Sequence, residues 1–243
     1  MKTKTLFFFC FFIGTLSAIS QSLTIGAKGT LTNCNKRGVY EFENFINNKS
    51  RKVSVFDYGL FASYKISERG EIQIELSKST KGFDYNSEFH LIDNRYIGCG
   101  GYYIGDYWQV PVIYKYKYGK IIKLTCFSGI YVAGLMKTEI NNTVAKFVLP
   151  DFTFEDYTDL VNDNFNKFDA GGLFGVGIEV PVYKSIYVLT EMQYCFGMLK
   201  LLKDKVVEYQ AEDISIPLIN HQKNIYSSTM MYSLGVLYRF PQK

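Results

Sequence analysis

The sequence predicts an all-β protein: an eight-stranded antiparallel up-and-down transmembrane β-barrel with short periplasmic turns and long external loops. Three observations lead to this fold class. Apolar and polar residues alternate with a period of two in eight stretches of the chain. Most stretches exceed both the ~5–6 residues typical of soluble strands and the ~9–11 that a tilted strand needs to cross a bilayer. Short and long connections alternate between the stretches, which is typical of membrane-spanning barrels.

The composition excludes other classes of protein. The 243 residues carry 27 Lys and Arg against 23 Asp and Glu, a net charge of only +4. A nucleic-acid binder held by a basic surface needs a larger excess, so we expect no nucleic-acid partner. Aromatic residues make up 17% of the chain, and no Pro/Ser/Gly-rich linker divides it. We therefore expect one folded domain rather than a disordered chain.

The N-terminus has the pattern of a secretory signal peptide. Lys2 and Lys4 precede an apolar run over residues 6–16, and the small residues Ala18 and Ser20 follow it. We predict a signal peptide over 1–20, cleaved after Ser20, and a barrel domain over 21–243. An uncleaved anchor is the alternative, although the run has only about half of the ~20 apolar residues that a spanning helix needs.

The eight stretches each place apolar residues at every second position. They lie near 22–33, 53–66, 71–85, 105–118, 121–136, 168–181, 186–199 and 225–240. In the same order, their apolar positions include Leu23 and Ile25, Phe56 and Leu60, Ile72 and Ile74, Val110 and Val112, Ile122 and Leu124, Val176 and Ile178, Val188 and Met192, and Leu234 and Val236. One face of each strand is therefore apolar along its length.

The opposite positions carry nearly all the charge. An eight-stranded barrel has an interior just wide enough for side chains to fill, so we expect these charges to pair into an interior polar plug rather than line a wide pore. The residues assigned to the plug are Lys28, Asp57, Lys65, Glu71, Glu75, Lys115, Lys117, Lys123, Glu179, Glu191 and Arg239. Lys81 and Asp169 share their parity, and Lys78 is the one charge on the apolar parity.

The alternation alone does not say which face is outside, because a soluble barrel with an apolar interior has the same pattern reversed. Strand length and the asymmetry of the connections favour an apolar outside. Short connections fall at 67–70, 119–120 and 182–185, and long ones at 34–52, 86–104, 137–167 and 200–224. Aromatic residues also gather at strand ends, Tyr107 among them, where a ring can lie at headgroup level. We assign a lipid-facing aromatic belt to Trp108, Tyr116, Tyr118, Tyr226, Tyr238 and Phe240.

The sequence offers little that points to catalysis. His90 and His221 fall in different long connections, no hydrolase or phosphate-loop motif occurs, and no Cys/His cluster has metal-ligand spacing. We predict no enzyme activity, no cofactor and no metal. Cys34 and Cys99 fall in long connections of a chain expected to be exported, so a disulfide between them and two free thiols are the alternatives that the sequence leaves.

Several segments together resemble one known family. They are KISERGEIQIELSKSTKG (65–82), WQVPVIYKY (108–116), SGIYVAGLM (128–136), FDAGGLFGVGIEVP (168–181), EMQYCFGM (191–198) and YSLGVLYRF (232–240). In this order they resemble the porT-like outer-membrane β-barrel domain of Bacteroidetes-type bacteria. The resemblance implies an eight-stranded outer-membrane barrel, with some relatives linked to protein secretion and gliding, and it supplies no catalytic residues.

We therefore predict a non-enzymatic integral barrel of the outer membrane with a binding, envelope-structural or secretion-supporting role. Its expected partners are outer-membrane lipid and an unidentified extracellular or envelope protein, and the barrel is expected to be a monomer. The alternatives are a secreted soluble barrel carrying a small apolar ligand and a narrow solute channel. The connection 34–52 has a net charge of +3, which suits binding of anionic lipid headgroups, and the connection 137–167 has a net charge of −3, which suits binding of a divalent ion or a basic partner. Two solvated loops without a ligand would have the same sequence pattern.

Overall fold

The computed structural model describes residues 23–37, 45–51, 53–90, 96–148, 151–159, 165–201, 208–211, 214–217 and 225–240. The expected signal peptide and His221 lie outside these residues. All regular elements in the described part of the chain are β-strands. No helix there is long and apolar enough to cross a membrane.

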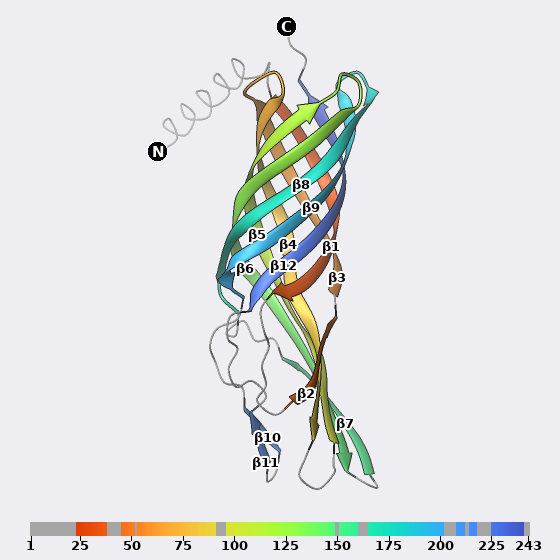
Figure 1. Cartoon of the computed structure of the whole chain (residues 1–243), viewed down its shortest axis with the longest axis vertical. Helices are drawn as coiled ribbons and strands as arrows, with labels where there is room; N and C mark the ends of the chain where they lie inside the picture. The colour runs from red at the N-terminus through yellow and green to blue at the C-terminus, as the bar shows by residue number, and fades with distance from the viewer. Residues whose placement is uncertain are drawn as a thin grey trace, which may run out of the picture.

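Eight long strands form a closed antiparallel barrel, which confirms the predicted fold class (Figure 1). The barrel strands are β1 (Leu23–Arg37), β3 (Val53–Lys65), β4 (Gly70–His90), β5 (Tyr96–Tyr118), β6 (Lys123–Val148), β8 (Phe168–Tyr183), β9 (Ile186–Lys200) and β12 (Tyr226–Arg239). Each pairs with the barrel strands before and after it in the chain, and β12 closes the ring on β1, from Thr24 opposite Arg239 to Arg37 opposite Tyr226. Closure removes the open edges that a sheet would otherwise present.

Tight turns join the strands at one end of the barrel, which we call the short-turn end. They span 66–69 between β3 and β4, 119–122 between β5 and β6, and 184–185 between β8 and β9. Gly119 has a φ of 114°, and a Cβ there would collide with the carbonyl oxygen of Ile122. Only glycine adopts this conformation without strain, so the residue fixes the β5–β6 turn.

At the other end, which we call the long-connection end, strands continue where the sequence suggested loops. β4, β5 and β6 extend beyond the barrel and are flanked by β2 (Phe45–Arg51), paired with β4, and β7 (Asp151–Asp159), paired with β6. Together they form a sheet in the order β2-β4-β5-β6-β7 that projects from the barrel, and we call it the projecting sheet (Figure 1). The remaining strands, β10 (Glu208–Ala211) and β11 (Ile214–Pro217), form a separate hairpin. Most of the described residues in the connections at this end thus lie in paired strands.

Side chains bridge the place where the barrel opens into the projecting sheet. β3 and β4 pair from Lys65–Glu71 to Gly59–Ser77 and no further. Beyond this point the Asp57 carboxylate accepts hydrogen bonds from the Thr80 amide (3.0 Å), the Thr80 hydroxyl (2.8 Å) and the Thr32 hydroxyl (2.7 Å). The Cys34 thiol donates to the Thr80 carbonyl at 3.0 Å. Side chains thus replace the lost strand partner at this β3–β4 junction.

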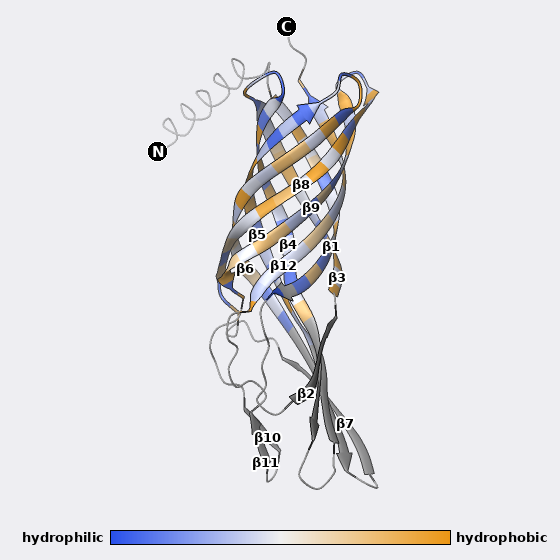
Figure 2. Cartoon of the chain, viewed as in Figure 1, coloured by the Kyte–Doolittle hydropathy of each residue, from blue (hydrophilic) through white to orange (hydrophobic). Residues whose placement is uncertain are grey.

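The apolar parity faces outward and the charged parity inward. Leu60 and Phe56 are 65% and 68% exposed on the outer surface, whereas Lys115 and Glu75 are 2% and 3% exposed inside. Figure 2 shows the same alternation of hydrophobic and hydrophilic residues along the barrel strands. The soluble-barrel alternative needs the reverse arrangement, with charges outside and an apolar interior.

Three sequence assignments need correction. Lys65 is exposed rather than interior, because it ends β3 at the short turns. Tyr107 is fully buried inside the barrel rather than at its surface. Cys34 is a buried free thiol, so no disulfide links it to Cys99. Both cysteines lie on strands instead of in loops, and β3 and β4 separate β1 from β5.

Candidate functional site

The middle of the barrel interior holds a neutral layer of ion pairs from four strands. Lys28 on β1 contacts Glu75 on β4 at 2.7 Å and Glu191 on β9 at 3.1 Å. Lys115 on β5 pairs with the other oxygen of Glu191, and Gln73 donates a hydrogen bond to Glu75. Two buried cations thus meet two buried carboxylates, and every charge has a partner.

A second neutral layer lies nearer the short-turn end. Lys117 contacts Glu71 at 2.6 Å and Glu179 at 2.5 Å, and Arg239 contacts Glu179 at 3.0 Å and Glu71 at 4.0 Å. The Ser63 hydroxyl donates to Glu71 at 3.2 Å. Arg239 is only half-buried because it ends β12 at the mouth of the barrel. Lys123, also assigned to the plug, is half-buried in the same region.

A third neutral layer, toward the long-connection end, consists of the ion pair between Lys81 and Asp169. The Lys81 Nζ atom lies 2.5 Å from the Asp169 Oδ2 atom, and the hydroxyls of Tyr131 and Ser227 each donate to that oxygen at 3.1 Å. The Lys81 ammonium also lies 4.2 Å from the centre of the Tyr131 ring and 5.1 Å from that of Tyr107. Such cation–π contacts stabilise a buried ammonium that has lost its contact with water.

Beyond this pair, buried aromatic residues close the interior. Phe83 stacks on Tyr103 with ring centroids 5.3 Å apart, and Tyr103 lies 6.4 Å from Phe165. Leu201 and Ile225 are buried beside the barrel end and are joined by a backbone hydrogen bond of 2.7 Å. We call Phe83, Tyr103 and Phe165 the aromatic plug. Sequence reasoning missed it, although the inward parity of Lys81 continues to Phe83 and could have revealed its first member.

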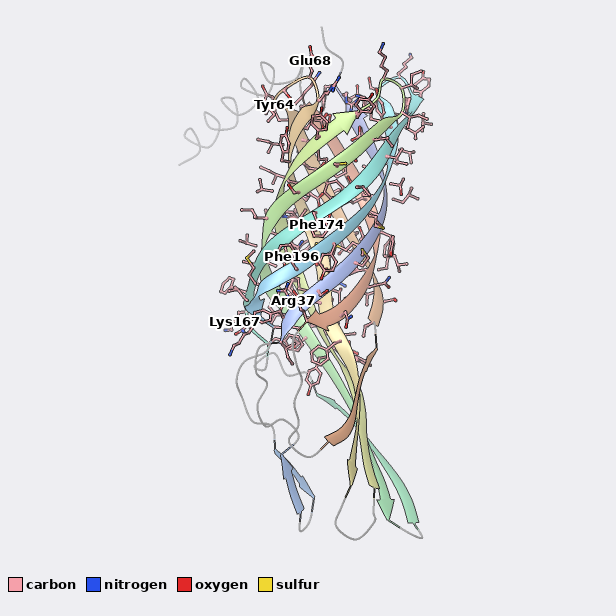
Figure 3. The ribbon with its side chains drawn as sticks, viewed as in Figure 1. Arg37, Tyr64, Glu68, Lys167, Phe174 and Phe196 are labelled. Atoms are coloured by element: carbon pink, nitrogen blue, oxygen red, sulfur yellow. The ribbon has the colours of Figure 1, made fainter. Side chains whose placement is uncertain are left out.

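The outer surface carries the aromatic residues assigned to a belt, together with others. Trp108, Tyr116, Tyr118 and Tyr238 are exposed, whereas Tyr226 and Phe240 are half-buried. Figure 3 labels Phe174 near the middle of the barrel wall, and Phe196 and Arg37 nearer the long-connection end. The Arg37 guanidinium lies 5.8 Å from the Phe196 ring centre and 5.6 Å from that of Tyr226. This end therefore combines aromatic rings with a cation, as suits an interface between hydrocarbon and water.

The described side chains form no group of three or more His, Cys, Asp or Glu residues that could hold a metal ion. The side chains of His90 and of the acidic residues on β7 lie outside the described set. Of the acidic residues in 137–167 only Glu139 has a described side chain, which accepts a hydrogen bond from the Tyr102 hydroxyl at 3.0 Å, so the expected binding of a divalent ion by this connection stays a prediction. What the described interior does provide is charge neutrality in three successive layers.

Comparisons with known proteins find similarity in solved structures. No protein-family model matches the chain, and no curated protein matches it. The match to Neisserial surface protein A is 13% identical, covers 90% of this chain and 97% of that chain, and has a TM-score of 0.36. The match to Ail, the attachment invasion locus protein of Yersinia pestis, is 10% identical, covers 90% of this chain and 99% of that chain, and has a TM-score of 0.38. The match to the outer membrane protein OprG of Pseudomonas aeruginosa is 8% identical, covers 91% of this chain and 97% of that chain, and has a TM-score of 0.44. The resemblance to the porT-like family rests on the sequence segments quoted above.

Proposed function

We propose that this chain is a non-enzymatic integral β-barrel of the outer membrane that binds or supports a protein partner. In this proposal residues 1–20 direct export and are removed, the short turns face the periplasm, and the projecting sheet faces outward. The observation that carries the proposal is the arrangement of the closed barrel, with exposed apolar side chains outside and paired charges inside.

The physical argument concerns the solvent on each side of the barrel wall. Hydrocarbon offers no hydrogen-bond partner, so a sheet can lie in it only when every backbone group is paired within the sheet. The closed ring of strands meets this requirement, and the exposed Leu, Ile, Val and aromatic side chains suit contact with acyl chains. A soluble carrier is disfavoured, because the space for its apolar ligand holds Lys28, Lys115 and Glu191 instead.

The layered interior favours a binding role over solute transport. Three neutral layers of ion pairs and the aromatic plug follow one another along the barrel axis, and they leave little room for a water-filled path. The projecting sheet offers a surface for a partner instead. In the described part of the chain β2 pairs only with β4 and β7 only with β6, so each has one edge open to strand addition. Because some members of the porT-like family are linked to protein secretion, we propose secretion as the process in which such a partner takes part.

Fractionation and conductance together test the proposal. After expression in a Gram-negative host, we expect the protein to stay in the outer-membrane fraction through extraction with high salt and with alkaline carbonate. Purified protein added to planar bilayers is expected to give no stepwise conductance. Release into the soluble fraction would overturn the membrane assignment and favour the carrier. Regular conductance steps from protein that resists extraction would show instead that the barrel is a channel.

A further inference from the structure

The short-turn end of the barrel opens into a cavity of about 790 Å³, which we call the short-turn cavity. Its wall includes seven Lys and Arg side chains but only two carboxylates, Glu68 and Glu71. The size lies within the ~300–1,000 Å³ of sites that bind small molecules. This surplus of positive charge sets the cavity apart from the neutral layers deeper in the barrel.

Two of the seven cations are already neutralised by carboxylates. Lys117 and Arg239 share Glu71 and Glu179 in the layer described above. The other five are Lys65, Arg69, Lys120, Lys123 and Lys184. In the described part of the chain none of these five has a carboxylate within 4.0 Å. Glu68 is the one remaining acid of the wall, and it cannot balance all five.

Lys123 shows most clearly that a counter-ion is lacking. It lies opposite Glu179 in the pairing of β6 with β8, where a cross-strand ion pair would be expected. Both oxygens of Glu179 are taken, one by Lys117 at 2.5 Å and the other by Arg239 at 3.0 Å. The Lys123 ammonium lies instead 5.8 Å from the centre of the Tyr187 ring. A half-buried ammonium without an anion is unfavourable, and an anion entering the cavity would relieve this.

We infer that the short-turn cavity binds a multivalent phosphate anion, held by Lys123 within the mouth and by Lys65, Lys120 and Lys184 around it. Lysine binds phosphate as a compact point charge with three donors, and several lysines around one cavity suit a ligand with several phosphate groups. If the barrel is oriented as proposed above, the ligand enters from the periplasm. A soluble phosphorylated compound and the headgroup of an anionic lipid share the required chemistry.

Calorimetric titration with inositol hexakisphosphate tests the site, using the full mature chain in zwitterionic detergent micelles. We expect one molecule to bind per barrel, with an affinity that falls as salt is added. The Lys120→Gln/Lys123→Gln variant is expected to lose about tenfold in affinity for each charge removed. The matched control is Lys137→Gln/Lys167→Gln, which removes two exposed lysines toward the long-connection end and should bind as the unmodified chain does. Lys137 lies opposite Asp106 in the pairing of β5 with β6, and Figure 3 labels Lys167.

The outcomes separate a built site from general attraction between charges. Equal losses in the two variants, or an unchanged affinity in the cavity variant, would overturn the inference. Unchanged Trp108 emission in both variants serves as the check that they are folded. Micelle binding does not depend on the membrane assignment, so the two proposals fail separately.

Vesicles identify the source of the phosphate. If phosphatidylglycerol vesicles weaken binding of the probe relative to phosphatidylcholine vesicles, the site takes a lipid headgroup. Equal binding in both vesicles assigns it to a soluble phosphate, and no binding in micelles or in either vesicle overturns it.

Discussion

Glu191 is the carboxylate that the buried Lys28 and Lys115 share, so its removal leaves these two cations with one carboxylate, Glu75, between them. In Glu191→Gln, Lys28 keeps Glu75, but Lys115 loses the one carboxylate within ion-pair distance among the described residues. We expect the free energy of unfolding to fall by ~3–5 kcal/mol, the usual effect of breaking a buried pair from one side. Urea unfolding in micelles, followed by the emission of the single tryptophan, Trp108, measures this loss.

The matched control for that variant is Glu68→Gln. Glu68 is exposed in the turn between β3 and β4, and Figure 3 shows it at the short-turn end. Surface substitutions of this kind change stability by about 0.5 kcal/mol or less. Equal stability of the two variants would mean that the middle ion layer contributes nothing to the fold.

At the residue scale the sequence assigns faces but not partners. Period-two alternation assigned Lys28, Lys115 and Glu191 to one face, because parity depends only on position along a strand. The contact between Lys115 on β5 and Glu191 on β9 crosses the barrel between strands that are not neighbours. It depends on tilt and stagger, which no single strand encodes. Lys65 was misplaced for a related reason, since parity does not say where a strand leaves the closed ring.

At the scale of elements, the β3–β4 junction makes a specific prediction. Asp57→Asn keeps the shape of the side chain but removes its charge, and its amide nitrogen cannot accept a hydrogen bond. Either the Thr80 hydroxyl loses its Asp57 acceptor, or the Thr80 amide and the Thr32 hydroxyl lose theirs together, and any bond that remains is to a neutral oxygen. Hydrogen bonds to charged groups contribute about 1.5–3 kcal/mol, so amide exchange at Thr80 should accelerate roughly tenfold or more. Hydrogen exchange followed by NMR in micelles reads this amide directly.

A neighbouring substitution serves as the comparison for the junction. The Ser54 hydroxyl donates to Asn33 at 2.7 Å on the exposed side of β3 and takes no part in the contacts of Thr80. Ser54→Ala should leave exchange at Thr80 as it is. If Asp57→Asn also leaves that exchange unchanged, Asp57 does not replace the missing strand partner.

The projecting sheet shows what alternation fails to detect in an element. Residues 86–104 and 137–167 lack a continuous apolar parity, so the sequence suggested loops there. The structure instead continues the ladders, for example from Asp84 opposite Tyr102 to His90 opposite Tyr96. Backbone hydrogen bonds do not require an apolar face, so a strand ladder can continue where the sequence does not alternate. The prediction therefore located the membrane-length part of each strand rather than its full extent.

At the scale of the whole molecule, the outward orientation of the apolar face predicts how much a charge introduced on the outer surface destabilises the barrel. Val112 lies on the outer face of β5, between the aromatic residues Trp108 and Tyr118. If lipid covers this face, Val112→Arg should destabilise the protein folded in phospholipid vesicles, lowering its free energy of unfolding by ~2–4 kcal/mol. Val182→Arg, at the exposed short-turn end, should lose only ~0–1 kcal/mol. Urea titration in vesicles compares the two; equal tolerance of arginine at both sites would argue against a surrounding bilayer.

The seam between β1 and β12 has a kinetic consequence. The other strand pairings around the ring join strands consecutive in the barrel, whereas this seam joins the first and last strands of the barrel, from Thr24–Arg239 to Arg37–Tyr226. Contacts so distant in sequence form slowly, because a long loop must be closed before they are gained. Until then two rows of amide and carbonyl groups have no partner and cannot enter hydrocarbon. In the proposed membrane location, insertion and closure of the barrel should therefore occur as a single late event, with lipid admitting only the completed ring.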